Sequence, residues 1–204
     1  MTAVRKRKAP TELSAEAIRR AALALIDRDG LAAFSTRKLG LALGCEAMAI
    51  YWYFASKDAL LDAVVDELMA GVVVDPGHDW IDVLRSVAHA YRRIAHAHPH
   101  AFPLLATRRF ASEGTFAFLE RLFELARAQG IDDAVTARFY RVVSSYCSGF
   151  ALNELATPRP GTAALRKRFA RVTAVSAWLE PQHLDETFHF GLELQLAALT
   201  RTTR

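Results

Sequence analysis

The sequence is poor in the residues that would indicate a disulfide framework or a membrane segment. Its 204 residues include only two cysteines, Cys45 and Cys147, too few for a stapled extracellular domain. Both lie in apolar helical patterns, which favours small buried side chains over a redox switch. No stretch approaches the roughly 18 consecutive apolar residues of a membrane helix, and the first ten residues lack the apolar core of a secretory signal. We expect an intracellular, cytoplasmic protein without membrane contact.

Catalytic and metal-binding motifs are also missing. The chain has no Gly-rich phosphate loop, no Gly-x-Ser-x-Gly and no His-Glu-x-x-His. His89, His96, His98 and His100 lie close in sequence, but residues two apart do not share a helical face. No cysteine or carboxylate completes a familiar ligand set, and histidines near a helix C-terminus also interact favourably with its dipole. We predict no enzyme activity, no cofactor and no metal site.

Positive charge is concentrated at one end of the chain. Residues 1–60 contain ten Lys or Arg against six Asp or Glu, whereas residues 61–204 contain sixteen of each. Four of the basic residues, Arg5, Lys6, Arg7 and Lys8, form a cluster without apolar neighbours. A neutral body with a basic head indicates a polyanionic partner such as DNA, and the cluster would be an arm on phosphates or in a minor groove. A solvated tail is the alternative.

The strongest local pattern lies between Ser35 and Asp58. We expect a first helix from Ser14 to Gly30, a second over residues 36–43 capped by Ser35, and a third over residues 46–53. Gly40, Gly44 and Ile50 have the spacing of a helix-turn-helix. The first lets two helices approach, the second makes the turn, and the third anchors the second helix.

Three adjacent aromatic residues, Tyr51, Trp52 and Tyr53, fan over roughly 200° of a helix, so at least one must point outward. A recognition helix here would present Glu46, Ala47, Met48, Tyr51 and Trp52 to the major groove. Its base readout would depend on apolar contact and DNA shape, with Glu46 able to accept from cytosine.

Phosphate contacts would come from residues flanking that helix. The candidates are Ser35, Thr36, Arg37, Tyr51, Tyr53 and Lys57. The alternative for Tyr51 and Tyr53 is that they support the first helix.

The run LGCEAMAIYWYFASKDALLDAVVDEL resembles the recognition and linker helices of the TetR family of transcriptional regulators. Their pattern is a Leu-Gly turn followed by Tyr-x-His/Tyr-Phe-x-x-Lys-Asp/Glu-x-Leu. The matching residues are Tyr51, Tyr53, Phe54, Lys57, Asp58 and Leu60. The resemblance implies an all-helical homodimer that represses from a palindromic operator and is released by a small-molecule effector.

The rest of the chain reads as helices separated by turn signals. Apolar residues at helical spacing predict helices over residues 57–72, 80–97, 101–109, 112–128, 132–156 and 184–199, with one basic helix containing Arg166 to Arg171 before Pro181. The expected fold is all-α. A three-helix DNA-binding domain over residues 1–60 precedes a larger ligand-binding and dimerisation bundle over residues 61–204.

The resemblance also implies a ligand pocket in this bundle, although packing in a core is the commoner role of buried aromatics. The candidate residues are Trp80, Tyr91, Phe102, Leu104, Thr107, Phe110, Phe116, Phe139, Tyr146, Phe150 and Asn153. Members that hold a drug with magnesium do so partly through histidines, one of them just before a Thr-Arg pair. Leu104 takes that place before Thr107 and Arg108 here, and residues 57–72 contain no histidine. We therefore expect a more apolar effector.

The last predicted helix is apolar over more than one stripe and so needs two partners. Its run FHFGLEL resembles the family's dimerisation helix, which implies a four-helix interface with residues 132–156 and their copies. The candidate interface residues are Val142, Phe150, Phe188, Leu192, Gln195 and Leu199. A helix buried inside a monomer is the alternative. Two other functions remain open: a DNA-binding protein that does not switch, and a helical small-molecule-binding protein without DNA function.

Overall fold

The computed structural model describes residues 13–108, 112–156 and 162–202. Within these ranges all regular secondary structure is helical, as predicted. The chain divides into two compact units, each described by itself. The head unit comprises the described residues of Met1–Gly71 and His98–Ala117, and the body unit those of Val72–Ala97 and Phe118–Arg204.

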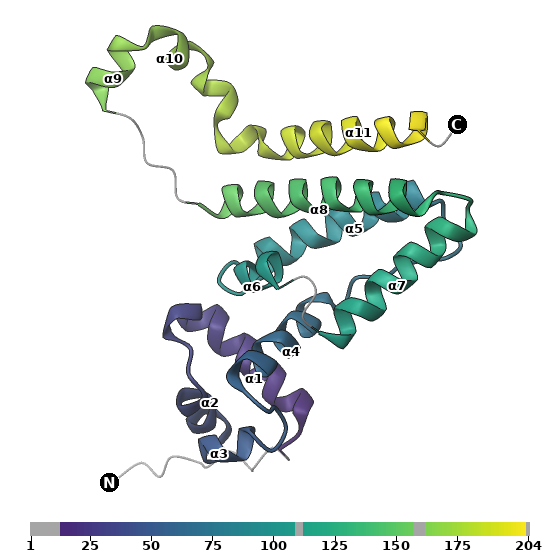
Figure 1. Cartoon of the computed structure of the whole chain (residues 1–204). Coiled ribbons are helices and arrows are strands. Elements are labelled where there is room, and N and C mark those ends of the chain that lie inside the picture. Colours follow the sequence, from purple (N-terminus) through teal and green to yellow (C-terminus); the bar gives the residue numbers. More distant parts are fainter. Residues whose placement is uncertain (1–12, 109–111, 157–161, 203–204) are drawn as a thin grey trace. The chain divides into compact units, whose positions relative to one another are not determined.

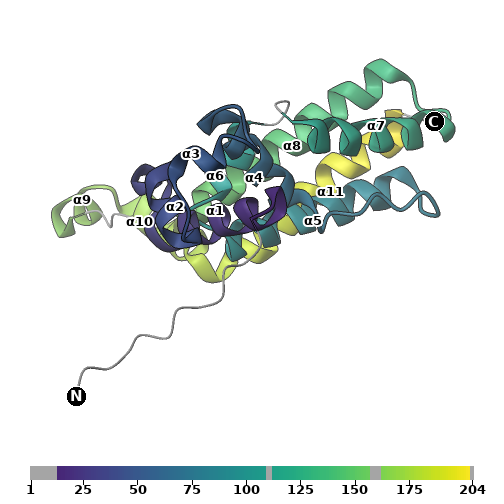
Figure 2. The same ribbon diagram turned by 90° about the horizontal axis from the view of Figure 1, so that it is seen from below.

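The head unit starts with three helices whose ends were predictable. Helix α1 is Ala15–Asp29, α2 is Thr36–Leu43 and α3 is Ala47–Ile50, with a short 3-10 helix at Leu31–Ala33. The Ser14 hydroxyl accepts from Ala17 N at 3.1 Å, and Ser35 caps α2 in the same way. Such caps contribute about 1 kcal/mol each. Figure 2 shows α1, α2 and α3 gathered together.

One apolar core joins these helices to α4, which is Lys57–Met69. Ile18, Ile26, Leu39, Ile50 and Leu60 are fully buried in it, and burying a side chain of this size stabilises by about 1.5–3 kcal/mol. The positions of these residues follow the predicted stripes, so the sequence pattern and the packing agree.

Helix α6, Phe102–Thr107, packs against α4. Arg108 follows it and forms ion pairs with Asp58 and Asp62 of α4, each at 2.6 Å. The hydroxyl of Ser112 donates to Asp66, one turn further along α4, and also accepts from Thr115 N at the start of α7. Asp58, Asp62 and Asp66, which are four residues apart on α4, therefore bind the segment that follows α6.

The body unit is built on three long helices. Helix α5 is Trp80–Ala97, α8 is Asp133–Leu155 and α11 is Leu184–Thr202. Figure 1 shows α5, α8 and α11 running side by side, and each packs on the other two. Helix α7, Glu113–Ala128, begins in the head unit and ends in the body, where the indole of Trp80 donates to Leu122 O at 3.0 Å.

Three helix predictions were wrong in detail. Helix α3 ends at Ile50, and residues 51–53 form a turn in place of a further helical turn. Helix α4 ends at Met69, before the predicted Val72. The single basic helix is two short ones, α9 at Ala163–Arg168 and α10 at Ala170–Ser176, because Phe169 leaves the helical region at φ −114° and ψ 66°. A 3-10 helix at Ala177–Leu179 and another at Pro181–His183 follow.

Among the described helices, none has the length and apolar character that a membrane crossing requires.

Candidate nucleic-acid interface

The turn between α2 and α3 depends on two glycines. Gly44 ends α2 in the left-handed region at φ 72° and ψ 27°, which L residues with a side chain rarely adopt. A Cβ on Gly40 would lie 2.8 Å from Cys45 O and 3.1 Å from Ala47 N. Because those atoms are backbone, only glycine allows α3 to approach α2 this closely. Ile50, fully buried, fixes the other side of α3.

This arrangement turns the opposite side of α3 outward. Met48 is 66% exposed and Trp52 is 89% exposed, while Glu46 is exposed at the N-terminus of the helix. Ala47 is half-buried against α2. An apolar side chain as exposed as Trp52, beside an exposed Met48, indicates a surface that meets a partner.

The two tyrosines that flank Trp52 are held by the protein itself. The hydroxyls of Tyr51 and Thr36 lie 3.3 Å apart, and Tyr53 donates to Leu13 O at 2.7 Å, just before α1. Tyr53 therefore supports the start of α1, which was the structural alternative for it. Both tyrosines are also exposed, so an anchored ring stays available on each side of Trp52.

Lysine side chains fix the loop between α1 and α2. Lys57 donates to Phe34 O at 3.3 Å and lies over the Phe34 ring at 5.6 Å, and Lys38 donates to Ala33 O at 2.9 Å. Arg37 is exposed at the start of α2. Lys38 lies beside this loop, as Lys57 does, but it was not predicted as a DNA-binding residue. The sequence signal that could have found it is its positive charge in the first turn of α2.

The structure thus brings Thr36, Arg37, Met48, Tyr51 and Trp52 to the α2–α3 motif. Leu41 is also exposed on the same motif, and sequence reasoning did not select it. The predicted arm, Arg5, Lys6, Arg7 and Lys8, lies outside the described residues.

Two sequence profiles decide the family. Residues 18–64 match that of bacterial regulatory proteins of the tetR family, and residues 74–202 match that of tetracyclin repressor-like C-terminal domains. The chain belongs to the TetR family of transcriptional regulators. The resemblance drawn from Tyr51 to Leu60 and the all-helical fold with an N-terminal helix-turn-helix are confirmed.

Individual TetR-family relatives match over different lengths. An HTH-type transcriptional regulator of Saccharopolyspora erythraea is 32% identical over 67% of this chain, and the match spans 59% of that relative. The class G tetracycline repressor of Vibrio anguillarum is 25% identical over 94% of this chain and 95% of its own length. A crystal structure of BioQ with its double-stranded DNA operator is 26% identical, with a TM-score of 0.66 over 92% of this chain and 98% of BioQ.

The residues predicted for a TetR-family ligand pocket are distributed over both units. Phe102 and Leu104 are buried in the head unit, where Thr107 donates to Pro103 O and Phe116 is largely exposed. Phe110 lies outside the described residues.

The remaining six belong to the body unit. Trp80 is fully buried, Tyr91 and the Ser148 hydroxyl lie 3.1 Å apart, and Tyr146 and Phe150 pack on Phe188. Phe139 is half-buried and Asn153 is exposed. Three hollows in the described part of the body unit are lined by other residues: one beside residues 73–86, one between α5 and α11, and one between α7 and α8.

The residues predicted for the dimer interface fall into two groups. Phe188, Leu192 and Leu199 are fully buried within the chain, and Gln195 donates to Gly191 O at 3.0 Å. Val142 is exposed on α8 and Phe150 is half-buried. Close to the buried group, Phe190 and Leu194 of α11 are exposed, and sequence reasoning missed them because α11 is apolar on several sides.

The four clustered histidines are divided between the units. In the head, His98 lies 2.7 Å from an Asp27 carboxylate oxygen and His100 the same distance from Asp27 O. His89 and His96 belong to α5 in the body. In the part of the chain that the structure describes, no three His, Cys, Asp or Glu side chains gather as metal ligands would.

Proposed function

We propose that this TetR-family chain is a repressor that binds a palindromic DNA operator as a homodimer and is released by a small, apolar effector. We assign DNA binding to residues 1–60, and ligand binding and dimerisation to residues 61–204. The observation that carries the DNA function is the exposure of Met48 on α3 and of Trp52 in the turn after it, while Ile50 between them is fully buried. Acting on DNA, the protein works in the cytoplasm, as a regulator and not as an enzyme.

The chemistry of this surface suits apolar readout in a major groove. Met48 and Trp52 offer contact to thymine methyl groups, and Glu46 accepts from cytosine N4. The Tyr51 hydroxyl, with Arg37 and Lys57, provides contacts to phosphates on either side, and Tyr53 adds one when its hydroxyl turns from Leu13 O to a phosphate. Phosphate contacts position the helix and carry the salt dependence, while the apolar pair supplies sequence preference.

The outward faces of α8 and α11 provide the two-fold contact. Phe190 and Leu194 lie one turn apart on α11, and Val142 and Leu152 are exposed on α8. Gly149 is exposed between these two α8 residues with open space around it, so a second helix can approach closely. In an isologous interface of this kind, the exposed residues of α8 and α11 contact the same surface of the second chain.

Release by an effector is a shift between two dimer shapes. Operator binding requires recognition helices about 34–36 Å apart, or at a spacing set by the half-sites. An effector that prefers another shape weakens DNA binding by its differential affinity, typically 1–3 kcal/mol. Arg108 and Ser112, which bind carboxylates of α4, precede α7 in the chain, so we infer that a movement of α7 would reach α4 through them.

Replacing Trp52 by alanine tests this function. Trp52 makes no internal hydrogen bond in the described structure and is 89% exposed, so the fold should survive while DNA affinity falls about 10-fold or more. Trp178→Ala, on the exposed 3-10 helix of the body, is the matched control and should bind DNA normally. Fluorescence anisotropy with promoter-derived duplexes measures both. Equal affinity of both variants and the unaltered protein would remove α3 from the interface.

A further inference from the structure

The segment formed by α9 and α10 exposes a row of apolar side chains. Leu165, Phe169, Val172 and Val175 are each between 40% and 62% exposed, at intervals of three or four residues, as on one side of a helix. Neither α9 nor α10 contains a buried residue, and among the described elements their main neighbours are each other and the 3-10 helix that follows. A row of this length indicates a surface that a partner covers.

The same segment is positively charged. Residues 162–179 contain no Asp or Glu but four Lys or Arg, namely Arg166, Lys167, Arg168 and Arg171. Helices of six and seven residues are marginally stable in water without tertiary packing. A surface that is both apolar and negative would therefore stabilise the α9–α10 segment by covering its apolar row and neutralising its charge.

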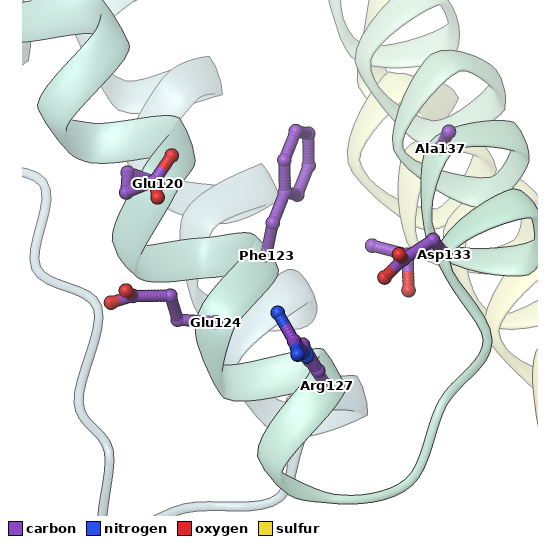
Figure 3. A pocket seen from close by; sticks show the side chains of 7 residues that line it. Glu120, Phe123, Glu124, Arg127, Asp133 and Ala137 are labelled. Atoms are coloured by element: carbon purple, nitrogen blue, oxygen red, sulfur yellow. The ribbon is translucent and has the colours of Figure 1, made fainter.

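A surface of that character lies between α7 and α8. It is lined by Phe123 and by the carboxylates of Glu120, Glu124 and Asp133, and of its described lining residues only Arg127 is a cation. Figure 3 shows Phe123 on α7 and Asp133 at the start of α8, beside the space between the two helices. Phe123 is half-buried, so part of an aromatic ring is available among the carboxylates.

Within one chain, these two surfaces belong to opposite ends of α8. Helix α9 begins at Ala163, after α8 ends at Leu155, whereas Asp133 is the first residue of α8. The 23 residues of α8 span roughly 35 Å. The chain also returns to the C-terminal end of α8 after α10, because Glu154 and Asp185 bind the same arginine. The acidic surface of its own chain is therefore the distant one for the α9–α10 segment.

A two-fold axis brings the two surfaces together. The proposed dimer contact includes Val142 and Leu152, which are exposed on α8, so the axis passes near this part of the helix. Two copies of a helix related by a perpendicular two-fold axis run antiparallel. The C-terminal end of one α8 then lies beside the N-terminal end of the other, and the basic segment of each chain lies beside the acidic surface of its partner.

We propose that the α9–α10 segment of each chain packs on the α7–α8 surface of the second chain. Its apolar row covers Phe123 of the partner subunit, and its Lys and Arg side chains lie among the carboxylates there. This contact rests on the proposed homodimer and is additional to the contact between the α8 and α11 faces.

Cross-linking between two differently tagged chains tests the contact. One chain carries Val172→Cys and the other Ala137→Cys, an exposed position on α8 that lines the acidic surface. Both carry Cys45→Ser, and the remaining Cys147 is buried. A short bismaleimide should give a covalent heterodimer, which requires contact between chains. The control pairs Val172→Cys with Val73→Cys, which is 70% exposed and outside α7 and α8, and should give little product.

Charge reversal tests the chemistry of the contact. Arg171→Glu should raise the dimer dissociation constant about two- to tenfold, because it replaces an attraction by a repulsion. Adding Glu120→Arg should recover part of that loss, since the reversed charges again attract. Arg20→Glu, which makes the same change of charge on α1 of the head, is the control and should leave the constant unchanged. Analytical ultracentrifugation measures all four proteins, the unaltered chain included.

Two outcomes would overturn the proposal while the homodimer stands. In the first, the protein sediments as a dimer, yet Val172→Cys cross-links no better to Ala137→Cys than to Val73→Cys. In the second, Arg171→Glu leaves the dissociation constant unchanged. A monomeric unaltered protein would contradict the homodimer itself, and the contact with it.

Discussion

At the scale of single residues, the helix-turn-helix depends on two glycines, because neither position accommodates a side chain. Gly40 has no Cβ where the backbone of Cys45 and Ala47 crosses it, and Gly44 adopts a positive φ. Both positions were predictable, because a helix-turn-helix has few ways to satisfy close approach and a tight turn. The buried Thr136 hydroxyl, which has no hydrogen-bond partner within the described residues, was not predictable, since threonine at a helical position gives no sequence signal of a missing partner.

Gly40→Ala should destabilise the head. The added methyl group lies 2.8 Å from Cys45 O, and relief requires a backbone shift that costs about 1–3 kcal/mol. Urea unfolding measures the loss of free energy, and DNA affinity should fall with it because α3 moves. Gly71→Ala, where a Cβ meets nothing within 4 Å, is the control. Equal stability of the two variants would contradict the close-approach argument.

At the scale of elements, one arginine joins the three helices of the body. Arg92 of α5 pairs with Glu154 of α8 at 2.7 Å and with Asp185 of α11 at 2.6 Å, and lies 4.7 Å over the Phe188 ring. The hydrogen bond to Glu154 raises the pKa of Arg92, and the hydrogen bond from Arg92 lowers that of Asp185. Sequence reasoning gave the helices but not this link, because the partners are 62 and 93 residues from Arg92.

Arg92→Met should lower the free energy of unfolding by about 3–5 kcal/mol, because it leaves the buried Glu154 carboxylate with only the His96 imidazole, 3.4 Å away, in place of a guanidinium. The side chain of Glu154 is only 4% exposed. The double variant Arg92→Met with Glu154→Met removes both charges and should recover much of that loss. Calorimetric melting of the two variants provides the comparison. A double variant no more stable than the single one would show that packing, not charge, was lost.

Acid should weaken the same helices. Burial lowers the pKa of His89 on α5, and the nearby charges of His189, Arg93 and Arg92 lower it further. A histidine whose pKa is lower when folded than when unfolded costs stability as pH falls below about 6.5, its unfolded value. Because the pKa values of Asp185 and Glu193 are lowered in the folded chain from 3.8 and 4.5, these carboxylates add a further loss only as pH falls below those values. The melting temperature should therefore fall from pH 7 to pH 5, and less so in His89→Gln. An identical pH profile in that variant would rule out His89 as the cause.

Helix boundaries show what local sequence could and could not specify. Ser14 and Ser35 were predicted at the starts of two helices, and these two residues, like Ser56 and Asp132, accept from a backbone N–H of the first helical turn. The break at Phe169 has no Pro or Gly to announce it, and neither α9 nor α10 contains a buried residue. Without a packed face, nothing in the hydrophobic pattern distinguishes one helix from two.

At the scale of the whole molecule, the family and the all-helical fold were readable from the 35–60 region, because that motif allows little variation. The roles of body residues were not. Helix α11 is apolar on several sides, and only packing reveals that Phe188 and Leu192 face inward whereas Phe190 and Leu194 face outward. Trp80 and Phe102, candidates for a pocket, are completely buried.

Leu194→Glu should abolish dimerisation. The side chain is 55% exposed within one chain, so a single molecule tolerates the charge, whereas a two-fold interface would bury two like charges together. Light scattering after size exclusion should give the monomer mass of 22.6 kDa. Val73→Glu, at a position that is 70% exposed and lies outside α8 and α11, should remain dimeric. A dimeric Leu194→Glu protein would move the interface elsewhere.

Selection from a random pool of DNA duplexes tests the central claim most directly. The account predicts enrichment of one palindromic sequence, bound by two chains per site, with an affinity that falls steeply as salt rises. Trp52→Ala should lose this enrichment while retaining its fold. Recovery of no common sequence, or of the same sequence with the same affinity by Trp52→Ala, would contradict the assignment of α3 as the element that reads DNA.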